Sequence, residues 1–158
     1  MNKNLLLSFV FLIGMILFTR WQGNSLVTPQ SPKGIIDLEF AKTPGRFHQL
    51  QMFWNYKTVA NIIYIDFLLI VAYTWFLVSA CKAIKNNKSN IFSTLAFSAA
   101  AFDALENFLL ILIWNGRFDT SVLHIVFYIA AIKFLLIAIV VGFIILSLFG
   151  LFKKETSL

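Results

Sequence analysis

The chain has 158 residues, of which 59% are hydrophobic and 13% are charged, and its mean hydropathy is +0.82. An average soluble domain has about 25% charged residues, so this composition excludes an ordinary soluble protein and indicates one integral membrane domain. The formal net charge of +6 fits the basic flanks of membrane spans, and no other feature points to a nucleic-acid partner.

Four apolar stretches are long enough to cross a bilayer as helices, which takes about 20 residues each. They cover residues 4–21, 59–81, 91–115 and 121–152. The sequence therefore predicts an all-α fold, with four transmembrane helices in an antiparallel bundle. The fourth stretch exceeds what one crossing needs, so we expect it to tilt or to extend beyond the hydrocarbon core.

The first stretch resembles a signal peptide, because Lys3 precedes its apolar run. No convincing small-x-small cleavage site precedes Ser25, and Trp21 suits the membrane interface. We therefore expect a retained anchor helix, with a cleaved signal peptide as the alternative.

The distribution of basic residues predicts the orientation, because Lys and Arg in short flanks stay on the cytoplasmic side. The residues that decide it are Lys3, Lys82, Lys85, Lys88, Lys153 and Lys154. Both termini are then cytoplasmic, and residues 22–58 form a longer outer segment. That segment has basic residues of its own, together with Asp37 and Glu39, but the rule weakens in a longer segment.

The outer segment contains two dipeptides typical of a helix N-terminus, Ser31-Pro32 and Thr43-Pro44. After the second, apolar residues at helical spacing predict a short helix over residues 44–54, on the bilayer surface or over the mouth of the bundle. Residues 35–40 alternate in a way that also suits a strand, although we favour a helix.

The third span contains ionisable residues where the surrounding chain is apolar. Asp103, Glu106 and Asn107 are three and four residues apart, so they share one helix face. Small residues continue this face through Ala96, Ala99 and Ala100, which predicts that it lies in the bundle interior. Ionisable groups inside a membrane are costly and usually mark a functional site.

Two further spans place ionisable residues at similar depth. With a rise of about 1.5 Å per residue, Asp66 lies about 10 Å below the outer end, Glu106 about 13 Å, and Asp103 and Lys133 about 18 Å. Three carboxylates then face one ammonium, a deficit of two. Bound protons or a bound cation would relieve it. The alternative is one ion pair that only sets helix register.

Four residues nearer the outer surface are candidates for a lid or mouth over this site. They are Asp37, Glu39, His124 and Tyr128. Asp37 and Glu39 suit ordinary loop charges as well as a lid that presents carboxylates to the pocket.

Most signatures of enzymes and metal sites are missing from the sequence. No Glu-x-x-His pair, HExxH motif, phosphate-binding glycine loop or GxSxG motif occurs, and the single Cys81 excludes an internal disulfide. We therefore expect no metal and no cofactor, and consider an enzyme less favoured than a binding protein.

The segment from Gly34 to Pro44, with Asp66 and the run from Asp103 to Asn107, resembles a group of small uncharacterised bacterial four-span integral membrane proteins. This resemblance implies the fold and topology and a bacterial inner membrane, but no activity. The bundle with intramembrane acids is also loosely similar to the emopamil-binding and sigma-2 receptor-like proteins, from which no residue role is transferred.

Three classes of function fit these observations. The first, which we favour, is a bundle whose acidic intramembrane pocket binds or transports a cation, a proton or a lipophilic amine. The second is a membrane-embedded enzyme that uses carboxylates as acid and base on a lipid-like substrate. The third is a structural or assembly subunit that pairs with another membrane protein or with a second copy of the chain.

Overall fold

The fold consists of helices of two lengths. The computed structural model describes residues 3–84 and 86–149. Four helices are long and apolar enough to cross a membrane: α1 (Lys3–Gly23), α4 (Tyr56–Ile84), α5 (Ser89–Trp114) and α6 (Leu123–Leu148). Between them lie α2 (Ile36–Glu39), α3 (Pro44–Phe53) and the 3-10 turns η1 (Asn24–Leu26) and η2 (Thr120–Val122). The predicted all-α membrane fold is confirmed.

The long helices differ from the predicted spans mainly at their ends. α4 begins at Tyr56 instead of residue 59, and α5 begins at Ser89 instead of residue 91. A helix continues while its backbone groups are paired, so it can extend past the apolar stretch that crosses the bilayer. The predicted end of the fourth span at residue 152 lies outside the described residues, as do Lys85, Lys153 and Lys154.

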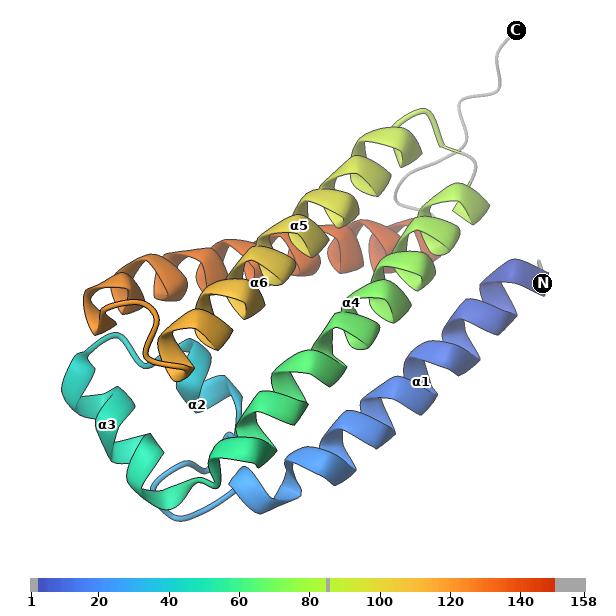
Figure 1. The fold of residues 1–158 in the computed structure, drawn as a ribbon. Helices are drawn as coiled ribbons and strands as arrows, with labels where there is room; N and C mark the ends of the chain where they lie inside the picture. Colours follow the sequence, from blue (N-terminus) through green and yellow to red (C-terminus); the bar gives the residue numbers. More distant parts are fainter. Residues whose placement is uncertain (1–2, 85, 150–158) are drawn as a thin grey trace, which may run out of the picture.

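The long helices alternate in direction and pack in the order α1, α4, α5 and α6 (Figure 1). α4, α5 and α6 form the centre of the bundle, since α4 also contacts α6. α1 packs along the side of α4 and buries only Ser8 and Met15 among its own residues. Its other side chains are at least partly exposed, as expected for an anchor helix surrounded by lipid.

Residues 24–55, which we call the cap, cover one end of the bundle (Figure 1). Phe47 and Leu50 of α3 are buried in the same apolar core as Trp114 at the end of α5. The rings of Phe47 and Trp114 lie 5.6 Å apart in an edge-to-face arrangement. The predicted helix over residues 44–54 is confirmed, and it lies over the mouth of the bundle.

The two predicted helix starts in the cap have different outcomes. The side chain of Thr43 accepts a hydrogen bond from the backbone N–H of Arg46 at 3.3 Å, so it caps α3 as predicted. Ser31-Pro32 does not start a helix, because a turn follows and α2 begins only at Ile36. The Ser31 hydroxyl instead donates to the carbonyl of Leu26 at 2.7 Å inside the cap. The helix favoured for residues 35–40 is confirmed, although it has one turn.

Two apolar cores divide the interior along the bundle axis. The cap-side core joins the cap to the near ends of α4, α5 and α6, and includes Leu38, Ile63 and Leu110. The far core lies toward the opposite end and consists of Leu77, Val78, Cys81, Ala96, Val140 and Phe143. The buried residues Asp103, Glu106 and Asn107 of α5 and Lys133 of α6 fall between these two cores.

Candidate functional site

One lysine ammonium lies among three carboxylates in the interior. Lys133 Nζ on α6 is 2.8 Å from Asp103 Oδ1 and 2.8 Å from Glu106 Oε2, both on α5. It is also 3.2 Å from Glu39 Oε2 on α2. The exposed fraction of each of these four residues is 7% or less. We call Lys133, Asp103, Glu106 and Glu39 the lysine cluster.

Hydrogen bonds extend this cluster onto α4. The Tyr73 hydroxyl donates to Asp103 Oδ2 at 2.9 Å, while the other Asp103 oxygen contacts Lys133. Asn107 Nδ2 donates to Asp66 Oδ2 at 2.7 Å. Side chains from α2, α4, α5 and α6 therefore meet in one polar layer between the two apolar cores.

Helical spacing explains how α5 contributes three members of this layer. Asp103, Glu106 and Asn107 share one face of the helix, and all three are buried. Ala96 and Ala99 continue that face and are completely buried, which allows neighbouring helices to approach closely. The prediction that this face lies in the interior is confirmed.

Glu39 reaches the layer because aromatic contacts hold the end of α2 against α6. The ring of Phe40 lies 5.6 Å from that of Phe127 and 5.9 Å from that of Phe134. The ammonium of Lys42 lies 5.0 Å from the centre of the Phe127 ring. Since α2 has only four residues, its position depends on such contacts and not on helix propensity.

The polar layer carries an excess of acidic groups. Glu39, Asp66, Asp103 and Glu106 are four carboxyl groups, and Lys133 is their one ammonium among the described residues. The formal deficit is three when all are ionised, one more than the sequence predicted, because Glu39 joins the layer. Buried charges without a counter-charge cost several kcal/mol each, and bound protons or a bound cation would relieve this excess.

The excess of acidic groups affects the environments of Glu39 and Glu106 most directly. Burial raises the pKa of Glu39 from 4.5 to about 7, against the opposing effect of Lys133. Glu106 is fully buried, and its Oε1 atom has no hydrogen-bond partner in the described part of the chain. A buried oxygen without a partner is costly, since it has given up its bonds to water.

The four residues predicted at a lid or mouth occupy different places. Glu39 belongs to the lysine cluster. Asp37 lies nearer the surface, where it accepts from the backbone N–H of Lys33 at 2.8 Å and lies 3.7 Å from Arg46 Nη2. His124 and Tyr128 are exposed on α6, and the Tyr128 ring lies 5.7 Å from Lys42 Nζ.

The five predicted site residues of the spans, Asp66, Asp103, Glu106, Asn107 and Lys133, all lie in the polar layer. Tyr73 was missing from the predicted site, although it follows Asp66 by two turns on the same face of α4. That spacing could have predicted that Tyr73 lies near the site, and the structure shows that its hydroxyl donates a hydrogen bond to Asp103.

The arrangement of the polar layer does not favour a metal centre or a lysine nucleophile. Among the described residues, no group of three or more His, Cys, Asp and Glu side chains is placed to hold a metal ion. Lys133 contacts carboxylates on several sides, so its ammonium is a counter-charge and not a free nucleophile. No known family model, curated protein or solved structure matches the chain.

Proposed function

We propose that this protein is a membrane bundle whose acidic intramembrane site binds a proton, a cation or a lipophilic amine, with Lys133 as its internal counter-charge. One observation supports the proposal above all others: Lys133 Nζ contacts three buried carboxylates, yet Glu106 Oε1 still has no partner among the described residues. A structural ion pair needs one carboxylate for one ammonium. The additional buried acids are explained by a positive ligand.

A proton fits this site with the least rearrangement. The Lys133 ammonium already lies within 3.2 Å of three carboxylates, which is where a larger cation would have to sit. A metal ion or an amine would therefore have to displace Lys133, whereas a proton needs only a carboxyl oxygen. The pKa of Glu39, raised to about 7, lets that member of the cluster exchange protons near neutral pH.

The site suits binding better than transport through the membrane. Between the polar layer and the far end of the bundle lies the apolar far core, in which the rings of Phe92 and Phe143 stack 3.8 Å apart. An ion crossing this core would lose its hydration without gaining polar partners. Exchange through the cap end, where Glu39 of α2 meets the cluster, is the shorter route.

The orientation that we propose puts the cap outside and both termini in the cytoplasm of a bacterial inner membrane. Lys3 and Lys82 lie at the end of the bundle opposite the cap, and Lys88 precedes α5 at that end (Figure 1). Basic residues in short flanks are retained on the cytoplasmic side. The site then samples protons and solutes from outside the cell.

Infrared spectroscopy of the purified protein in lipid tests proton binding directly. We expect absorbance from protonated carboxyl groups at neutral pH in the wild type, and a smaller band in Glu106→Gln. Asp119→Asn is the matched control, because this carboxylate is exposed and the backbone N–H of Ser121 holds its pKa below the usual value. The control should leave the band unchanged.

Ligand binding gives the complementary test. Binding of cations and amphiphilic amines should weaken in Asp103→Asn and Glu106→Gln and should change in Lys133→Met. Three results together would contradict the proposal: the three variants bind like the wild type, the wild type shows no protonated carboxyl group at neutral pH, and Lys133→Met loses only stability. The cluster would then be a structural device that sets helix register.

A further inference from the structure

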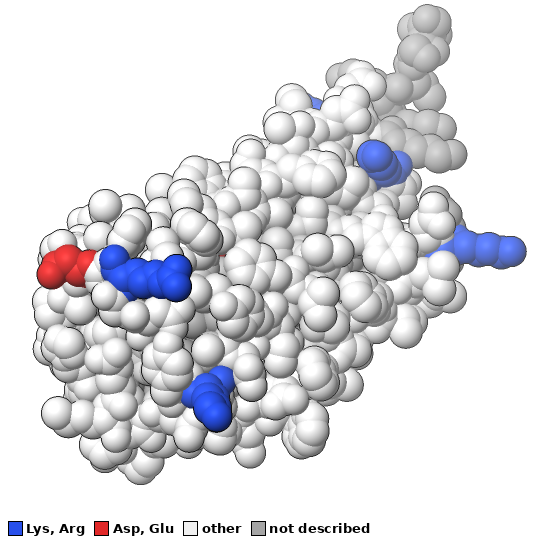
Figure 2. All heavy atoms as spheres, in the orientation of Figure 1, with Lys and Arg blue, Asp and Glu red and all other residues white. Residues whose placement is uncertain are grey.

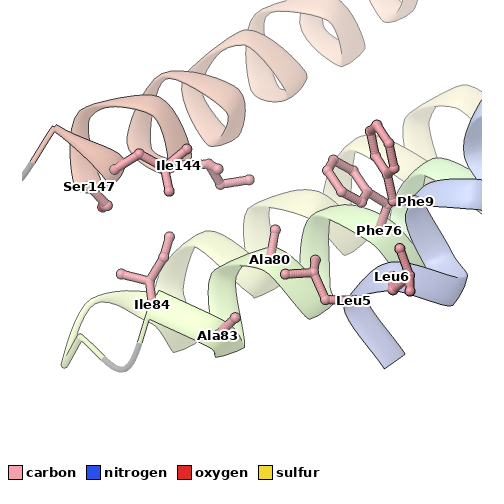
Figure 3. A pocket seen from close by; sticks show the side chains of 10 residues that line it. Leu5, Leu6, Phe9, Phe76, Ala80, Ala83, Ile84, Ile144 and Ser147 are labelled. Atoms are coloured by element: carbon pink, nitrogen blue, oxygen red, sulfur yellow. The ribbon is translucent and has the colours of Figure 1, made fainter. Parts of the chain in front are cut away.

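A cavity lies between α1, α4 and α6, at the end of the bundle opposite the cap (Figure 3). Its volume is about 540 Å³, within the range of about 300–1,000 Å³ typical of ligand sites. The side chains of Ala80, Ile84 and Ile144 point into the space between α4 and α6 (Figure 3). Leu5 and Phe9 of α1 line another side, and the cavity stays partly open to the surroundings.

The lining of this cavity is apolar with one exception. Ser147 lines it near the end of α6, and its hydroxyl is buried without a hydrogen-bond partner among the described residues. A serine inside a helix can usually bond to the carbonyl one turn before it, as Ser93 does to Ser89 at 2.8 Å. The cavity therefore offers one hydrogen-bonding group in an otherwise apolar surface.

Basic side chains flank the same end of the bundle. Lys3 starts α1 two residues before Leu5, and Lys82 precedes Ala83, which also lines the cavity. Both lysines are exposed. All described acidic residues lie in the cap, in the polar layer or beside η2, so none offsets this positive charge. On the face drawn in Figure 2, Lys and Arg side chains appear at both ends of the bundle, whereas acidic side chains appear only at the cap end.

We propose that this cavity holds one acyl chain of an anionic phospholipid, whose phosphate group lies near Lys3 and Lys82. The apolar lining of the cavity favours the acyl chain, because the chain has no polar groups that need hydrogen bonds. The two lysines attract the headgroup, each contributing about 1 kcal/mol near an anionic membrane surface, or about fivefold in affinity. The Ser147 hydroxyl is available to donate to an ester oxygen. The bound lipid would join α1, the least buried long helix, to α4 and α6.

A phospholipid explains these observations better than a second protein helix. A helix would need a groove along the bundle, whereas this cavity is confined to the last turns of α4 and α6 and the first turns of α1. A neutral lipid or a detergent would fill the apolar space equally well but would have no negative group for the two lysines to contact. Selectivity for headgroup charge therefore distinguishes the proposed ligand from these alternatives.

The test uses the full chain in nanodiscs made from equal parts of phosphatidylglycerol and phosphatidylcholine. The protein is extracted in mild detergent, and retained lipids are counted by native mass spectrometry. We expect the wild type to retain phosphatidylglycerol preferentially. Lys3→Gln and Lys82→Gln should each lower the ratio of phosphatidylglycerol to phosphatidylcholine about fivefold. Lys57→Gln, an exposed lysine at the cap end, is the matched control and should leave the ratio unchanged.

Filling the cavity gives an independent result. Ala83 lines the cavity and is exposed, so Ala83→Phe should insert a ring into it and reduce the retention of both lipids. If Ala83→Phe does not fold, the two lysine variants still decide the question, because they leave the apolar lining intact. Equal retention of both lipids by the wild type overturns the proposal, as does a ratio that the lysine variants do not change.

Discussion

Glu39 Oε2 lies 3.2 Å from Lys133 Nζ, although Glu39 belongs to the cap and Lys133 to the middle of α6. Through this contact, a one-turn helix outside the long apolar helices shares a counter-charge with Asp103 and Glu106. Whatever changes the charge of the cluster therefore also changes how firmly α2 is held. The cap and the intramembrane site are one electrostatic unit.

The stability of the protein should depend on pH because the Glu39 carboxyl group binds a proton more tightly in the folded state. Its pKa rises on folding from 4.5 to about 7, so the folded protein holds this proton more tightly than the unfolded chain does. Its contribution to stability is complete below about pH 4.5 and is lost as the pH rises through about 7. We expect the apparent melting temperature in detergent to fall over this range, and Glu39→Gln to reduce that slope.

A control for this prediction lies on the same short helix. Asp37 pairs with Arg46 near the surface and does not contact Lys133. Asp37→Asn should therefore leave the pH slope of the melting temperature close to that of the wild type. A slope that Glu39→Gln leaves unaltered would show that Glu39 does not bind a proton in this range.

Removing the ammonium should be more damaging than removing one carboxylate. Lys133→Met leaves three buried acids without their counter-charge, and breaking such an arrangement costs about 3–5 kcal/mol. Adding Glu106→Gln should recover part of this loss. The loss of unfolding free energy in the double variant should therefore be smaller than the sum of the losses in the two single variants. Denaturant unfolding in detergent micelles measures the cycle. Strictly additive effects would contradict direct coupling.

The hydrogen bond between Tyr73 and Asp103 permits a conservative test. Tyr73→Phe removes only the hydroxyl that donates to Asp103 Oδ2, and a hydrogen bond to a charged group contributes about 1.5–3 kcal/mol. Tyr64→Phe is the matched control, because Tyr64 lies on the same helix and is 57% exposed. We expect a lower free energy of unfolding for Tyr73→Phe only. Equal effects of the two changes would show that the hydrogen bond from Tyr73 to Asp103 does not stabilise the protein.

The parts of the structure that were predictable from sequence rest on local periodicity. Apolar runs predicted the four long helices, and spacings of three and four residues predicted that Asp103, Glu106 and Asn107 share one buried face. Thr43-Pro44 predicted the start of α3 for the same reason, because an N-cap bond forms between residues close in sequence. In each case the decisive interaction lies within one element.

The features that the sequence did not reveal depend on contacts between distant residues. Asp37 and Glu39 are equivalent in the sequence, and it is the contact of Phe40 with Phe127 and Phe134 that directs Glu39 inward. Ser31 resembled an N-cap, but the indole N–H of Trp54 donates to its hydroxyl oxygen at 3.2 Å and keeps it inside the cap. No pattern local to either residue distinguishes these outcomes.

The proposed orientation can be tested with single cysteines introduced into a Cys81→Ala variant. Cys81 is buried in the wild type, and its removal ensures that only the introduced cysteine can be labelled. A side chain at Gly45 meets no atom within 4 Å, and Asn90 is exposed near the start of α5. Because basic flanks stay in the cytoplasm, a membrane-impermeant maleimide added to intact cells should label Gly45→Cys. It should label Asn90→Cys only after the cells are lysed. The opposite pattern would place the cap in the cytoplasm, and the lysine cluster would then exchange protons with the cell interior.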